Sequence, residues 1–266
     1  MRPIITLTTD FGNKDYFVGN IKGVILGINR DLDIISISHE VRSYNIREGA
    51  FIINAAYKYF PKSSIHIGIV DPGVGGTRRP ILVEANNHYF IGPDNGLFSY
   101  IYKEDPKVKV IEIKSEHYFL KSEGTTFHGR DIFAPVAAWL SKGVKMTNFG
   151  DEITDFKRFP VPDINRPDND TVKGEIAYID RFGNLISNIT RTDIDQFIVN
   201  KGIKGLQIRI KERTIAGLRD YYGQAEAGGI DAIINSNGHL EVFSFMKNAK
   251  DILGVSIGEE ITVSIR

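Results

Sequence analysis

Hydrophobic and polar positions in the first half of the chain alternate between the spacing of strands and the spacing of helices. Apolar residues three or four positions apart predict a helix over 16–29, and Asn45 with Glu48 forms a capping box for a second helix, which Pro61 ends. Short β-rich runs are expected at 4–8, 33–37, 64–70 and 108–113, with a hairpin over 81–91 and a third helix over 132–140. Because helices separate the strands, the pattern predicts an α/β domain with a mostly parallel sheet and helices on both faces.

The second half of the chain has a different pattern. A stretch rich in proline and aspartate marks a linker at 161–172. Beyond it, strand-like runs recur at 174–179, 205–210, 230–235, 240–245 and 260–265, with one short helix at 249–253. We therefore expect the α/β domain to cover residues 1–160, and an all-β domain, a small barrel or sandwich, to cover 173–266.

Composition narrows the classes of partner. The 266 residues carry 33 basic and 33 acidic side chains without a long basic run, which favours a small-molecule ligand over nucleic acid or a membrane surface. The chain has no cysteine, so disulfides, thiolate nucleophiles and cysteine-type zinc sites are excluded. No apolar stretch reaches the roughly 18 residues of a membrane helix, and no signal peptide is visible, so the cytoplasm is the expected location.

Carboxylates directly follow three of the expected strands. Asp10 lies in the Thr9–Gly12 segment, Asp71 follows Val70, and Asp94 lies in Gly-Pro-Asp-Asn-Gly. In an open α/β sheet, ligands bind at the carboxyl ends of the strands, where such residues converge. Aspartate also forms turns and caps helices, but three at three strand ends favour a site for a ligand with hydroxyl groups or positive charge.

The glycines and histidines carry weaker signals. The glycines at 73–76 are not followed by the Gly-Lys-Ser/Thr of a phosphate loop, and no dinucleotide fingerprint occurs. His128 lies between an aromatic residue and a glycine just before the expected third helix, a position suited to an acid/base group. No HxH or HExxH pair is present among the six histidines, and we predict no metal. A metal-dependent hydrolase with Asp10, Asp71, Asp94 and His128 as ligands stays open as an alternative, to be tested with a strong chelator.

Seven segments, taken in chain order, resemble the S-adenosyl-L-methionine (SAM) hydroxide adenosyltransferases, relatives of the fluorinating and chlorinating enzymes that act on the same compound. They are Thr9–Gly12 with Asp15, Lys22–Gly23, Val70–Gly76 with Arg78, Gly92–Leu97, Phe127–Asp131, Asp180–Asn188 and Asn235–Gly238. Each segment is weak alone, but seven in register across both domains are specific. The resemblance implies hydrolysis of SAM to adenosine and L-methionine by water or hydroxide attack at C5′ of the ribose, with no cofactor.

The resemblance also implies a catalytic triad, which falls on Asp71, Arg78 and His128. The sulfonium of SAM is already a good leaving group, so what the reaction lacks is a nucleophile. Arg78 is expected to favour hydroxide, while Asp71 or His128 takes the proton; the sequence leaves open which. A non-catalytic protein that binds adenosine or SAM is a second alternative, against which the complete triad argues.

Substrate contacts are implied in both domains. Asp10 is placed at the ribose hydroxyls, and Asp180 and Ser236 at the amino and carboxylate ends of methionine. Further substrate-binding residues are expected at Asp15, Phe127, Phe182, Asn184 and Tyr222. Asn237 stands where some relatives have a basic residue, so we expect Ser236 and backbone N–H groups to hold the carboxylate. The resemblance further implies a homotrimer with active sites between neighbouring subunits.

Hydroxide rather than halide is the expected nucleophile. The halogenating relatives have a small hydroxyl residue where this chain has Gly129, so a hydrogen-bond donor to a bound halide is missing. The hairpin between Glu84 and Tyr89 is short, whereas the fluorinating relatives carry a long insertion there.

Overall fold

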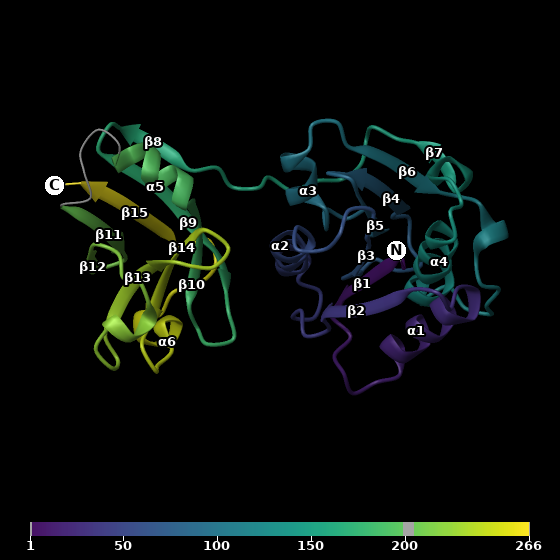
Figure 1. The fold of residues 1–266 in the computed structure, drawn as a ribbon, viewed down its shortest axis with the longest axis horizontal. Coiled ribbons are helices and arrows are strands. Elements are labelled where there is room, and N and C mark those ends of the chain that lie inside the picture. Colours follow the sequence, from purple (N-terminus) through teal and green to yellow (C-terminus); the bar gives the residue numbers. More distant parts are fainter. Residues whose placement is uncertain (1, 199–204, 266) are drawn as a thin grey trace. The chain divides into compact units, whose positions relative to one another are not determined.

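The chain forms two compact units, residues 1–161 and 162–266. The computed structural model describes residues 2–198 and 205–265 (Figure 1). Half of the expected linker at 161–172 is strand in the structure: β8 (Asn165–Asp168) and the start of β9 (Thr171–Ile179) lie within it. Pro167 indicated a linker, but it lies in β8, an exposed edge strand where a missing backbone N–H is tolerated.

The first unit is built on a seven-stranded sheet in the order β2-β1-β3-β5-β4-β6-β7. Its strands are β1 (Ile4–Thr9), β2 (Asp33–Ser38), β3 (Ile65–Ile69), β4 (Pro80–Ala85), β5 (His88–Pro93), β6 (Lys109–Ile113) and β7 (Gly150–Glu152). The β2-β1-β3-β5 half is parallel, and β4, β6 and β7 pair antiparallel. The sheet is therefore mixed rather than mostly parallel. The cause is local: Asn86 and Asn87, both at positive φ, close a two-residue hairpin that reverses the chain between β4 and β5.

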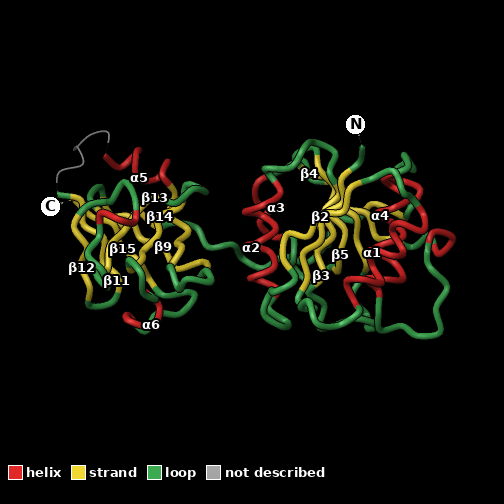
Figure 2. Tube along the Cα trace, turned by 60° about the horizontal axis from the view of Figure 1, so that its bottom comes forward, coloured by secondary structure: helices red, strands yellow, loops and turns green. Residues whose placement is uncertain are grey.

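Helices cover both faces of this sheet, as predicted. Figures 1 and 2 show α1 (Phe17–Ile28) and α4 (Ala134–Ser141) on one face and α2 (Ile46–Tyr57) with α3 (Ser99–Glu104) on the other. Alternate residues of each strand supply two cores. One core contains Ile5, Leu7, Ile21, Ile25 and Val136, and the other Ile53, Val83, Phe90, Phe98 and Ile101. Of these four helices, the sequence predicted all but α3.

The end of the first unit runs back over α3. The ring of Phe156 lies 4.4 Å from that of Tyr102, centroid to centroid, and the backbone N–H of Phe159 donates to Ser99 Oγ at 3.0 Å. Phe156 and Phe159, with Ile153, pack on the second core. Residues 153–159 are therefore a covering segment of this domain.

The second unit is a β-domain with two short helices. Its strands pair antiparallel in the order β12-β11-β15-β9-β10-β14-β13, with β8 on β9. The remaining strands are β10 (Leu185–Thr190), β11 (Leu206–Ile210), β12 (Arg213–Ala216), β13 (Ile230–Ile234), β14 (His239–Ser244) and β15 (Glu260–Ile265). A bridge between Arg219 and Ile233 brings the two ends of the sheet together, so the domain is a nearly closed barrel rather than a sandwich.

The sequence predicted one of the two α-helices among the described residues of the β-domain. Helix α6 (Ala249–Leu253) was predicted, whereas α5 (Arg191–Ile198) was missed. The signal for α5 was present, because Thr190 and Asp193 exchange hydrogen bonds across its first turn. No helix in the described ranges is both long enough and apolar enough to cross a membrane.

A buried pair of histidines lies inside the first unit. His66 Nδ1 is 2.8 Å from Thr6 Oγ1, and His66 Nε2 is 3.2 Å from His88 Nδ1. His66 is 1% exposed and packs against the rings of Tyr57 and Phe90. Burial, together with neighbouring His88, lowers the pKa of His66 to about 3. Burial and the charge of Lys62 lower the pKa of His88 as well.

We predict that this pair makes the protein sensitive to acid. Below the ordinary histidine pKa of about 6.5 the unfolded chain binds a proton that the folded chain refuses at His66, so His66 costs up to about 1.4 kcal/mol of stability per pH unit. Urea unfolding between pH 7 and pH 4.5 should therefore show a smaller loss of stability for His66→Gln than for the unmodified protein. The exposed His117→Gln variant is the control. An unchanged pH slope in His66→Gln would contradict the prediction.

Candidate active site

A pocket of about 610 Å³ opens at the carboxyl ends of two neighbouring parallel strands. Thr9 of β1 pairs with Ile69 of β3, and Asp10 and Asp71 follow these strand ends. Both aspartates line the pocket, as do three further residues predicted from the sequence, Asp15, Phe127 and His128. The structure thus gathers five of the predicted site residues at one edge of the sheet.

Asp71, Arg78 and His128 form one connected group. Arg78 Nε donates to Asp71 Oδ1 at 2.9 Å, and Arg78 Nη2 donates both to Asp71 Oδ2 and to His128 Nδ1, the latter at 2.8 Å. The side chains of Arg78 and Asp71 are 6% and 5% exposed. A bidentate pair at this depth fixes both side chains, because breaking it would leave a charge buried without a partner.

The hydrogen bond from Arg78 also sets the state of His128. A guanidinium only donates, so Nδ1 of His128 accepts and the ring proton of the neutral form lies on Nε2. Burial, reinforced by the positive charge of Arg78, lowers the pKa of His128, while Asp71 and Asp131 oppose the shift. His128 is therefore a neutral hydrogen-bond donor toward the pocket that it lines.

Arg78 itself is not among the residues that line the pocket. Its Nη1 is buried and has no hydrogen-bond partner among the described residues. Arg78 thus lies behind Asp71 and His128 and orients them.

Local backbone geometry holds this group. Gly75 has φ +75°, and a Cβ there would lie 2.9 Å from the carbonyl oxygen of Thr125, so the loop after Asp71 approaches the segment before His128 closely. His128 precedes a π-helical turn, Gly129–Phe133, at the start of α4. Such turns are rare and occur frequently at functional sites.

Aromatic side chains form one wall of the pocket, and of these only Phe127 was among the site residues predicted from the sequence. The rings of Phe11, Phe17 and Phe127 lie within 6 Å of one another, centroid to centroid. Tyr44, also a lining residue, donates its backbone N–H to Asp10 Oδ2 at 2.8 Å. Phe11 belongs to the Thr9–Gly12 segment, which the sequence had indicated. The place of Tyr44 in the pocket could not be predicted, because it depends on a backbone conformation with φ of 67°.

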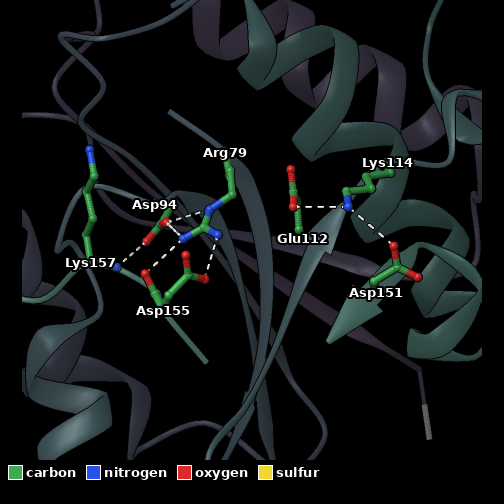
Figure 3. Close-up of polar contacts among 7 residues, drawn as sticks. All are labelled: Arg79, Asp94, Glu112, Lys114, Asp151, Asp155 and Lys157. Atoms are coloured by element: carbon green, nitrogen blue, oxygen red, sulfur yellow. Dashed lines mark hydrogen bonds and ion pairs between the residues drawn. The ribbon is translucent and has the colours of Figure 1, made fainter. Parts of the chain in front are cut away.

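Asp94 is not part of this pocket. It is 1% exposed and accepts hydrogen bonds from Arg79 Nε and Nη2, at 3.1 and 2.8 Å, and from the backbone N–H of Lys157 at 2.7 Å (Figure 3). Arg79 Nη1 also contacts Asp155 at 2.7 Å, while Lys114 bridges Glu112 and Asp151 further along the sheet. Asp94 therefore holds the covering segment in place.

Two of the four residues named for the metal-dependent alternative are paired with arginine. Asp94 is engaged with Arg79, and both oxygens of Asp71 accept from Arg78. Within residues 2–198 and 205–265, no three His, Asp or Glu side chains are grouped as metal ligands.

The β-domain carries a second pocket, of about 570 Å³. Four predicted residues line it: Asp180, Phe182, Asn184 and Tyr222. Asp180 Oδ1 accepts the backbone N–H groups of Phe182 and Asn184, both at 2.9 Å, and Oδ2 accepts Asn184 Nδ2 at 3.2 Å. Asp180 therefore builds the turn that presents Phe182, whose side chain is largely exposed, to the pocket.

Ser236 lies outside this group. It is exposed in the turn between β13 and β14 and does not line the pocket. Asn235 shapes that turn, because its Oδ1 accepts the N–H groups of Asn237 and His239, both at 3.0 Å. The role of Ser236 at the substrate carboxylate stays a prediction. The lining residues that the sequence did not indicate are Phe243, Ser244, Phe245, Met246 and Lys247.

A buried Asp–Arg–His group beside a pocket at the carboxyl edge of an α/β sheet, with a β-domain that has its own pocket, is typical of an enzyme that acts on a small molecule. Comparison with known protein families is more specific. The model of the SAM hydroxide adenosyltransferase N-terminal domain matches residues 5–150, and that of the C-terminal domain matches residues 174–262. The chain belongs to the SAM hydroxide adenosyltransferase family.

Individual relatives agree with this assignment. The chain is 36% identical to the (R)-S-adenosyl-L-methionine hydrolase of Methanocaldococcus jannaschii, over 98% of this chain and 95% of that protein. It is 28% identical to the fluorinase of Nocardia brasiliensis, over 76% of each. Among solved structures, an uncharacterized conserved protein from Thermotoga maritima superposes with a TM-score of 0.89 at 32% identity, covering 98% of this chain and 99% of that one.

Proposed function

We propose that this protein hydrolyses SAM to adenosine and L-methionine, with water as the source of the new 5′-hydroxyl. The observation that carries the proposal is the buried Asp71–Arg78–His128 group at the edge of a pocket, in a chain of this family that is similar over nearly its whole length to (R)-S-adenosyl-L-methionine hydrolases. Asp10 and Asp15 in the same pocket suit a ligand that carries ribose hydroxyls and positive charge.

The reaction forms one C–O bond and breaks one C–S bond. Oxygen of water attacks C5′, the C5′–S electron pair leaves with methionine, and one proton is released. Removal of the proton gives the attacking oxygen the character of hydroxide, so opposite charges combine at C5′, and a pocket that excludes water and aligns the reactants favours this step.

The geometry supports a division of labour within the triad. His128 Nδ1 is occupied by Arg78, so His128 donates from Nε2 and holds the attacking oxygen. Asp71 is an acceptor that lines the pocket, and its remaining lone pairs take the proton of the water. Arg78 fixes both groups from behind and keeps the Asp71 carboxylate oriented.

The assembly that we propose is a homotrimer in which each active site combines two domains from neighbouring subunits. Two features support it. The triad and Asp10 belong to the pocket of the α/β domain, whereas Asp180, Phe182 and Tyr222 belong to that of the β-domain. SAM has both a ribose and an amino-acid end, so it needs contacts from both pockets.

The test is product identification. Purified protein incubated with SAM in oxygen-18 water and a strong chelator should release adenosine labelled at the 5′-hydroxyl, and excess fluoride or chloride should yield no 5′-halogenated nucleoside. The expected absence of halogenation is supported by Gly129, where a Cβ would lie 2.8 Å from Ile69 Cδ1 and a serine would need Ile69 to move. Dependence on metal would favour the metal-hydrolase alternative, binding without turnover a SAM-binding protein, and a halogenated main product a halogenase.

A further inference from the structure

Glu241 of β14 is a buried carboxylate directly behind the β-domain pocket. It is 2% exposed, and its Oε1 accepts the hydroxyl of Tyr222 at 2.9 Å while Oε2 accepts Asn235 Nδ2 at 3.1 Å. Neither donor carries a charge, so both hydrogen bonds stabilise the carboxylate and leave its negative charge in place. Burial disfavours the charged form of this acid and therefore raises the pKa of Glu241.

The two donors belong to the parts of the domain at which we propose substrate contacts. Tyr222 lines the pocket, and its ring meets that of Phe243 edge to face at 4.9 Å, so Phe243 and Glu241 together fix its orientation. Asn235 shapes the turn that carries Ser236, and its bond to Glu241 determines which way its amide faces. Glu241 is therefore hydrogen-bonded both to the pocket wall, through Tyr222, and to this turn, through Asn235.

The charge of Glu241 also acts on the pocket. Asp180 lines the pocket and is near enough to raise the pKa of Glu241 through repulsion between the two carboxylates. The lining thus combines Asp180 with the cation Lys247, and the buried Glu241 carboxylate lies behind it, in a partly buried setting where charge interactions are stronger than in water.

We propose that Glu241 is a positioning residue that fixes Tyr222 and the Asn235 turn, and that its buried charge selects a cationic adenosyl ligand over a neutral one. The inference rests on the proposed function for the choice of ligand. SAM carries a sulfonium, whereas S-adenosylhomocysteine has the same adenosyl and amino-acid parts around an uncharged sulfur. Adenosine and methionine, the products, also lack the sulfonium, so the same charge favours substrate over products.

Two variants separate the two effects of Glu241. Glu241→Gln keeps the shape and one acceptor oxygen but removes the charge, whereas Tyr222→Phe keeps the charge and removes one hydrogen bond. In a His128→Ala background, where SAM should persist, calorimetric titration at pH 8 gives the Kd of SAM and of S-adenosylhomocysteine. We expect Glu241→Gln to weaken SAM binding about tenfold, and S-adenosylhomocysteine binding about twofold or less. Tyr222→Phe should weaken both equally. Glu260→Gln, an exposed carboxylate of the same domain, is the matched control and should change neither.

Equal weakening of both ligands by Glu241→Gln, or no weakening, would overturn the inference. If Glu241→Gln does not fold, Glu241→Asp decides: it keeps the charge, so the preference for SAM must survive, and its loss would overturn the inference. Failure of SAM to bind the His128→Ala protein would overturn this inference and the proposed function together. Binding with the expected selectivity, but no hydrolysis by the unmodified protein, would leave the inference standing and remove only the proposed function.

Discussion

Replacing Arg78 with alanine should reduce kcat for SAM hydrolysis by about 10²-fold or more, the effect of removing a preorganised electrostatic group. The same change leaves Asp71 buried without its partner, so we expect a loss of about 3–5 kcal/mol in the free energy of unfolding. Adenosine release measured against time gives kcat, and urea unfolding gives the stability. His128→Ala should lower kcat by a similar factor with a smaller loss of stability, because His128 contributes a single bond to the group.

A double variant separates the loss of activity from the loss of stability. Arg78→Met with Asp71→Asn removes both charges, so stability should recover in part while turnover does not. Asp10→Ala is the comparison for binding: it should raise KM first, since Asp10 is assigned to the ribose. Normal turnover in His128→Ala would show that the triad assignment is wrong.

Co-expression of two inactive variants should restore activity. Asp71→Ala removes a residue of the α/β pocket and Asp180→Ala one of the β-domain pocket, so each chain retains the half-site that the other lacks. In a mixed trimer with sites between neighbours, one of the three sites combines two intact halves, so roughly a third of the activity per site should return.

The measurement needs two differently tagged chains purified together, so that mixed oligomers are assayed. Each variant expressed alone, and the two mixed after separate purification, serve as controls. Verified mixed oligomers without recovery would show that each site lies within a single chain.

The α/β pocket could be predicted from the sequence because its acidic residues lie directly after the ends of strands. Asp10 and Asp71 come immediately after two apolar strands that pair in parallel, and this order places them side by side. The helical period predicted over residues 16–29 and the capping pair at Asn45 likewise depend on local spacing, and the structure confirms both.

Features that depend on distant partners were not predictable in this way. Asp94 looked like a third site carboxylate, but Arg79 and the backbone of Lys157, 63 residues further on, bind it inside the domain. The antiparallel pairing of β6 with β4 joins segments far apart in the sequence, and apolar spacing does not encode it. The tautomer of His128 and the role of Glu241 follow from single hydrogen bonds that no periodicity encodes.

The covering segment at 153–159 has a consequence for how the α/β domain can be separated from the rest of the chain. The family model of that domain stops at residue 150, before Phe156, Phe159 and the N–H that Asp94 accepts. A fragment cut at that point would expose the apolar surface that Phe156 and Phe159 cover and would remove one hydrogen-bond donor from the buried Asp94 carboxylate. Exposed apolar surface of this kind favours aggregation. The smallest autonomous piece that retains the pocket lined by Asp71 and His128 therefore extends to residue 161.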